Sequence, residues 1–150
     1  MTTSDDLSGT TFHEAGHAVV AWSLGIPVAR IAIGVDGDEA AGEADISTQQ
    51  NHLPLVDRIA IWLSGIEAQD LFRCPTNQLA GRSDLGNVAR IILDEGLSED
   101  QSKEVRKAGR QRARELILKH EGKVRQLAAR LVERHQIDGS EFLSLMNATD

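Results

Sequence analysis

The stretch His13-Glu14-Ala15-Gly16-His17 has the pattern H-E-x-x-H, and its spacing governs the interpretation of the rest of the chain. In an α-helix, residues i and i+4 lie about 40° apart around the axis and roughly 6 Å apart along it, so both imidazoles face one side. Both rings can then reach one ion. Zinc accepts neutral imidazole nitrogens at about 2.0–2.1 Å, and a third protein ligand would leave one position for water. We therefore predict that His13 and His17 are metal ligands.

Glu14 would lie beside that water. Its carboxylate could take a proton from the water and later deliver it to a leaving amine, as metal-assisted amide hydrolysis requires. An alternative needs no metal: Thr11 could cap the helix, Glu14 could reach back to it in a capping box, and the histidines would be ordinary helical residues. On the first interpretation, Glu14 is the general base.

Length and charge limit the classes of function. The 150 residues suit one domain with a hydrophobic core and are too few for two, so we expect a single domain over 1–150, with residues 1–9 flexible. The formal charge of −7 argues against non-specific binding to nucleic acid or to an anionic membrane surface. Peptides, small or basic ones especially, are easier partners.

Two features bear on where the protein works. The single cysteine, Cys74, cannot form an internal disulfide and fits a reducing compartment. No apolar run approaches the ~18 residues of a membrane span, and Met1 to Ser8 lacks a signal-peptide core. We expect a cytoplasmic protein.

A helix and a hairpin are expected in the first third of the chain. The motif helix should begin at a cap between residues 8 and 11 and run to about Leu24, before the stop signals Gly25 and Pro27. Alternating apolar residues predict a strand over 28–35, and a turn at 36–38 would lead to a second short strand around 43–47. If an edge of this hairpin flanks the metal cleft, an extended peptide could dock there as an added strand.

Helical periodicity dominates the remainder. The predicted helices cover about 54–72, from Ser83 to Gly96, a charged segment opened by a capping box at Ser98, a segment around 124–132, and about 138–146. We predict that the charged face of the helix that begins after Ser98 is exposed to solvent. The fold class predicted is mainly α, with a small β-hairpin or short sheet beside the H-E-x-x-H helix.

The third ligand has to come from a distant acid. A third histidine six residues after His17 would be needed for a metzincin, and Ser23 stands there. Three acids on predicted helices remain as candidates: Glu67, Asp70 and Asp84. Asp84 would fall in a first helical turn, where the helix dipole favours the ionised form that a ligand needs, although aspartate is also common there for structural reasons.

Four segments together point to a known family. They are FHEAGHAVV at 12–20, RIAIWLSGIEAQDL at 58–71, GRSDL at 81–85 and DEGLS at 94–98. They resemble, respectively, the H-E-A-G-H-A segment, the second helix, the G-A-S-N-D-L element and the G-M-S that follows it in the peptidase domain of FtsH-type ATP-dependent zinc metalloproteases. The resemblance implies that Asp84 completes a zinc site with His13 and His17.

Two departures from the family matter. Gln69 stands where the family usually has a glutamate, so the resemblance assigns no contact to that side chain. The chain also contains no G-x-x-x-x-G-K-[ST] phosphate loop, so we expect no ATP-driven unfolding by these residues. A separate ATPase partner or a homo-oligomer stays open.

The sequence thus predicts a zinc metalloendopeptidase that hydrolyses peptides or unfolded chains without ATP. The alternative is an inactive, peptidase-like protein whose structural metal supports a binding or regulatory surface. A fourth coordination position closed by a side chain such as Glu67 would favour that alternative. A small-molecule hydrolase using the same ion is a third possibility.

Overall fold

The protein is mainly helical with one small antiparallel sheet, which confirms the predicted fold class. The computed structural model describes residues 4–36, 39–74 and 78–148. In chain order its elements are α1 (Ser4–Ser23), β1 (Val28–Asp36), β2 (Glu39–Ile46), α2 (Leu55–Leu71), α3 (Gln78–Asp94), α4 (Glu99–Lys119), α5 (Glu121–Arg134), β3 (Gln136–Asp138) and α6 (Gly139–Asn147). No helix in these ranges is long and apolar enough to cross a membrane.

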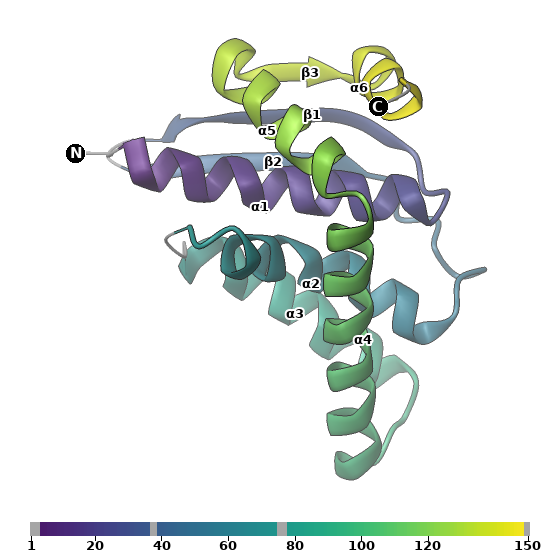
Figure 1. Ribbon diagram of the computed structural model, residues 1–150. Coiled ribbons are helices and arrows are strands. Elements are labelled where there is room, and N and C mark those ends of the chain that lie inside the picture. Colours follow the sequence, from purple (N-terminus) through teal and green to yellow (C-terminus); the bar gives the residue numbers. More distant parts are fainter. Residues whose placement is uncertain (1–3, 37–38, 75–77, 149–150) are drawn as a thin grey trace.

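Helix α1 lies at the centre of the molecule. Figure 1 shows it between the sheet, which covers one side, and α2 with α3 on the other. Its side chains are buried almost continuously from Gly9 to Ala21, so it lacks the single apolar stripe of a surface helix. The H-E-x-x-H motif is therefore held by packing on both sides.

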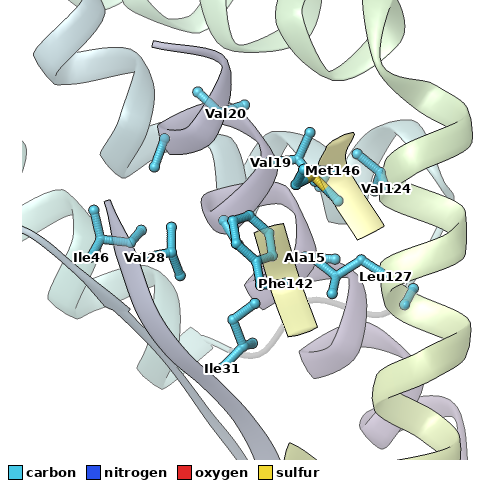
Figure 2. Packing of buried hydrophobic residues seen from close by; sticks show 14 of the residues in the cluster. Ala15, Val19, Val20, Val28, Ile31, Ile46, Val124, Leu127, Phe142 and Met146 are labelled. Atoms are coloured by element: carbon cyan, nitrogen blue, oxygen red, sulfur yellow. The ribbon is translucent and has the colours of Figure 1, made fainter. Parts of the chain in front are cut away.

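The main hydrophobic core forms where α1, the sheet, α5 and α6 meet. Figure 2 shows Val19 of α1, Ile31 of β1 and Leu127 of α5 near Phe142 and Met146 of α6. All five side chains are at most 1% exposed. Each fully buried side chain of this size stabilises the fold by about 1.5–3 kcal/mol. This core fixes α1 against the sheet.

The sheet has the strand order β2-β1-β3, so β2 forms one of its edges. Strand β1 pairs antiparallel with β2 over Val28–Ile46 to Asp36–Glu39, and with β3 around Ile31–Ile137. Our sequence prediction missed β3, because three residues are too few to show a period of two. The predicted second strand was placed too late in the chain.

Ion pairs join α4 to α2. The Glu67 carboxylate, whose side chain is 6% exposed, accepts hydrogen bonds from Arg110 Nε at 3.0 Å and Arg114 Nη1 at 2.9 Å. Arg112 bonds Asp57 at 3.0 Å. The basic face of α4 is therefore only partly solvated, contrary to our prediction, because three of its arginines hold acids of α2.

Two predicted helix starts are wrong. Helix α1 begins at Ser4, so residues 4–9 are helical and Thr11 is an interior residue that donates from Oγ1 to Leu7 O at 2.7 Å. The capping-box alternative for the motif fails with it. Helix α3 begins at Gln78, so Ser83 is not its cap, and Asp84 does not lie in its first turn as predicted.

Other predicted boundaries agree more closely. Helix α2 begins at Leu55, with Pro54 as its N-cap, one residue later than predicted, and Ser98 forms the predicted capping box with Gln101. Asp138 caps α6 by accepting from Glu141 N at 2.8 Å. The predicted turn at 36–38 lies partly outside the described residues, since 37 and 38 are not among them.

Candidate metal centre

Three acceptor-bearing side chains from two helices meet beside α2. His13 Nε2 lies 2.8 Å from Asp84 Oδ2, His17 Nε2 lies 2.9 Å from the same oxygen, and the two Nε2 atoms are 3.1 Å apart. All three residues are buried. The group could hold a metal ion. The structure thus brings together the three residues that the sequence and the resemblance singled out.

Both histidine rings are oriented by hydrogen bonds on their far side. His17 Nδ1 lies 2.8 Å from the backbone oxygen of Ile61, and His13 Nδ1 lies 2.7 Å from Gln69 Oε1. A backbone oxygen can only accept a hydrogen bond, so Nδ1 of His17 must carry a proton. The amide oxygen of Gln69 also accepts, so Nδ1 of His13 carries a proton as well. In the neutral rings each Nε2 therefore presents a lone pair toward Asp84.

The space between the three atoms suits a small ion. Ligand atoms arranged tetrahedrally at about 2.0–2.1 Å from zinc lie about 3.3 Å from one another, close to the spacing found here. Gly65 of α2 borders the same space: a Cβ added there would lie 2.5 Å from His13 Nε2 and 2.6 Å from His17 Nε2. The missing side chain at Gly65 is what leaves the space open.

The electrostatics of the group favour bound positive charge. Burial opposes ionisation of Asp84, but hydrogen bonds and charge from His13 and His17 outweigh it and lower its pKa to about 2. Burial likewise opposes protonation of His17, yet the hydrogen bond and charge of Asp84, with the charge of Glu14, raise its pKa to about 9. The anionic form of Asp84 is the form that a metal ligand requires.

Glu14 lies beside the triad under strand β2. A Cβ built on Gly42 would lie 2.8 Å from Glu14 Cγ and 2.9 Å from its Oε2, so the β2 backbone passes directly against this side chain. Glu14 is 6% exposed, and burial raises the pKa of its carboxyl despite the opposing charges of His17 and His13. Gly42 itself is exposed.

The other candidate ligands lie elsewhere. Glu67 binds Arg110 and Arg114, and Asp70 Oδ2 accepts from Arg114 Nη1 at 2.8 Å. Within the described residues, the only group of three or more His, Cys, Asp or Glu side chains that could hold an ion is the triad itself. Glu67 therefore does not close a fourth coordination position.

Our sequence interpretation missed the part that α2 plays. It assigned no role to Gly65 or to the carbonyl of Ile61, and it left Gln69 without a contact. One signal was available for Gly65: glycine inside a buried helix costs about 1 kcal/mol relative to alanine, so it indicates a close approach. The same argument applies to Gly16, where a Cβ would lie 2.7 Å from Ser64 O of the neighbouring α2.

Comparison with known proteins identifies no family for this chain, so the site is interpreted from its geometry. No protein-family model matches the chain. A search of the curated proteins returns no significant match either. The resemblance to FtsH-type peptidase domains consequently stays a prediction from the quoted segments.

Proposed function

We propose that this chain is a zinc-dependent metallopeptidase that hydrolyses peptide bonds in peptides or unfolded chains. The observation that carries the proposal is the convergence of three lone-pair acceptors, from His13, His17 and Asp84, with the carboxylate of Glu14 at their side. The resemblance of segments 12–20, 58–71 and 81–85 to an FtsH-type peptidase domain supports the same class.

The ligand set supports zinc in particular. Two imidazoles and one carboxylate are typical of catalytic zinc, because three protein ligands leave the fourth position for water. When bound, zinc would polarise the scissile carbonyl and lower the pKa of its water towards about 7. Asp84 would supply the one negative charge among the ligands, and Ile61 and Gln69 would hold the two rings in place.

Glu14 would move the proton in this reaction. Its Oε2 would accept a proton as the water oxygen bonds the scissile carbon, and the carboxyl would then give that proton to the amide nitrogen as the C–N bond breaks. Burial, which raises the pKa of Glu14, makes its carboxylate a stronger base. The side chain stays beside the metal ligands through the packing of α1.

Strand β2 offers a place for the peptide. It is an edge strand of the sheet, and its exposed Gly42 lies against Glu14. A peptide added alongside β2 would form main-chain hydrogen bonds and bring one of its carbonyls towards the triad, with little demand on sequence. A peptide complex without main-chain pairing to residues 28–47 would remove this part of the proposal.

The test is Glu14→Gln, assayed on casein and on a peptide library with and without a chelator. We expect zinc to stay bound and hydrolysis to fall by about 10²–10⁴-fold, the usual contribution of a general base. Glu133→Gln, an exposed position on α5, is the control and should keep full activity. Unchanged peptide hydrolysis in Glu14→Gln would overturn the role of Glu14. Activity on small esters or amides but not on peptides would point to a small-molecule hydrolase.

A second candidate is a non-catalytic protein with a structural metal. The observation that favours it is burial: the side chains of His13, Glu14, His17 and Asp84 belong to residues that are at most 7% exposed. Such a protein would bind zinc and gain stability from it, yet would cleave neither casein nor peptides at any zinc concentration. Hydrolysis by the wild type that a chelator abolishes would exclude it.

A further inference from the structure

The two ring-orienting partners of the triad differ in what they can do. Ile61 O belongs to the backbone and can only accept a hydrogen bond. Gln69 presents a side-chain amide, which accepts through Oε1 but would donate through Nε2 if the amide turned over. Gln69 is 1% exposed, and its Oε1 lies 2.7 Å from His13 Nδ1. The orientation of this amide is therefore set by its contacts inside the protein.

The orientation of the amide decides the tautomer of His13. With Oε1 toward the ring, Nδ1 carries the proton and Nε2 is free to bind a cation. With the amide reversed, Nδ1 would accept and Nε2–H would point at Asp84 Oδ2, 2.8 Å away, which would satisfy both groups without a metal. A carboxylate at this position would allow only the first arrangement, and it would also add negative charge next to the ligand.

We propose that Gln69 is a positioning residue that sets the metal affinity of this site, holding it below the affinity that a carboxylate partner would give. The proposal rests on the metal-binding half of the proposed function and is independent of whether the site hydrolyses peptides. It predicts opposite effects for two substitutions at one position. Removing the acceptor should weaken metal binding, and replacing the amide by a carboxylate should strengthen it.

The experiment measures zinc affinity by competition with a chromophoric chelator, on full-length protein, for Gln69→Met and Gln69→Glu. Gln69→Met keeps the volume but loses the acceptor, and its affinity should fall by roughly 10–100-fold. Gln69→Glu should bind zinc at least about tenfold more tightly than the wild type. Circular dichroism and the thermal midpoint report whether each variant folds.

Gln50 supplies the matched control. It is 5% exposed, and its Nε2 donates to Ser47 O at 2.8 Å. Gln50→Met and Gln50→Glu make the same changes at a buried glutamine that is bonded only within its own loop in the described part of the chain, and they should leave zinc affinity within about twofold of the wild type.

The possible outcomes separate the two proposals. A wild type that binds no zinc removes the proposed function. A wild type that binds zinc, with Gln69→Met within twofold of it, removes only the role of Gln69. If Gln69→Met fails to fold, Gln69→Glu decides, because weaker binding than the wild type overturns the proposal and tighter binding supports it.

Discussion

Gly65 is the residue whose lack of a side chain keeps the metal space open. In Gly65→Ala, the new Cβ would lie within 2.6 Å of both Nε2 atoms, too close for either ring to stay in place with an ion between them. We expect zinc content to fall to near zero while the helical fold persists, since alanine is favoured over glycine in a helix by about 1 kcal/mol. Metal analysis of the purified protein and circular dichroism measure both effects.

Gly86→Ala is the control for that variant. Gly86 lies inside α3, two residues from Asp84, and a Cβ there would meet nothing within 4 Å. This substitution should keep full zinc content and raise the stability of the fold by up to about 1 kcal/mol. Full zinc occupancy in Gly65→Ala would show that the ion does not lie between the two Nε2 atoms.

At the scale of residues, the sequence predicted the metal ligands better than it predicted the residues that surround them. His13 and His17 could be predicted because helical geometry alone puts i and i+4 on one face. Asp84 needed the family resemblance, since the local argument for it, a place in the first turn of a helix, does not hold in the structure. The contact of Gln69 could not be predicted, because it depends on how α2 is rotated against α1, which only tertiary packing decides.

The contact between α1 and α2 depends on Gly16. A Cβ at this position would lie 2.6 Å from Ala68 Cβ and 2.7 Å from Ser64 O, and a backbone oxygen cannot move unless α2 moves. We expect Gly16→Ala to lower the free energy of unfolding by about 1–3 kcal/mol, through overpacking that exceeds its gain in helix propensity. Urea unfolding measures the change.

The same displacement of α2 should also weaken zinc binding, because Ile61 and Gln69 orient the rings from that helix. Gly122→Ala on α5, where a Cβ meets nothing within 4 Å, is the comparison and should be neutral or stabilising. Equal stability of Gly16→Ala and Gly122→Ala would mean that α1 and α2 can separate at no cost, contrary to the packing found here.

Among the acids of α2 that bind arginines of α4, Glu67 is the most buried. Glu67→Gln keeps the shape of the side chain but removes the charge that Arg110 and Arg114 bind, so we expect a loss of about 1–2 kcal/mol, allowing for the partial exposure of both arginines. Glu115→Gln, at an exposed pair with Arg112, should cost no more than about 0.5 kcal/mol. If the two variants unfold at the same urea concentration, the buried position of Glu67 confers no advantage.

At the scale of elements, the sequence predicted those whose signals are local. The strand over 28–35 shows the period of two, and the caps at Ser98 and Asp138 lie where their side chains can accept from the first turn. The predicted starts of α1 and α3 were wrong because residues inside each helix, between 8 and 11 and at Ser83, were taken as caps, and serine and threonine also occur in helix interiors. Strand β3 exists only because it pairs with β1, and such long-range pairing leaves no trace in three residues.

At the scale of the whole molecule, the triad connects α1 and α3, two helices that contribute to different hydrophobic clusters. Helix α1 belongs to the main core with the sheet and α5, whereas α3 packs on α2 in a second cluster formed by Ile59, Leu63, Val88 and Ile92. Asp84 is the side chain through which α3 hydrogen-bonds to α1 within the described residues. A metal ion held by His13, His17 and Asp84 would therefore fasten α3 directly to α1, in addition to the packing of α2 against both.

Metal removal should accordingly loosen α3 before the rest of the protein. A free zinc concentration of 100 times Kd adds about 2.7 kcal/mol to the stability, which corresponds to roughly 5–10 °C in Tm for a chain of this size. Hydrogen exchange should show the largest loss of protection in α3 after chelation and a small one in α5, which is fixed by the main core. Asp84→Asn removes the charge of the ligand. In this variant, zinc should neither raise the Tm nor protect α3 from hydrogen exchange. A Tm that does not depend on zinc, or a loss of protection spread evenly over α3 and α5, would mean that no metal fastens α3 to α1, because a ligand can stabilise only the state that it binds.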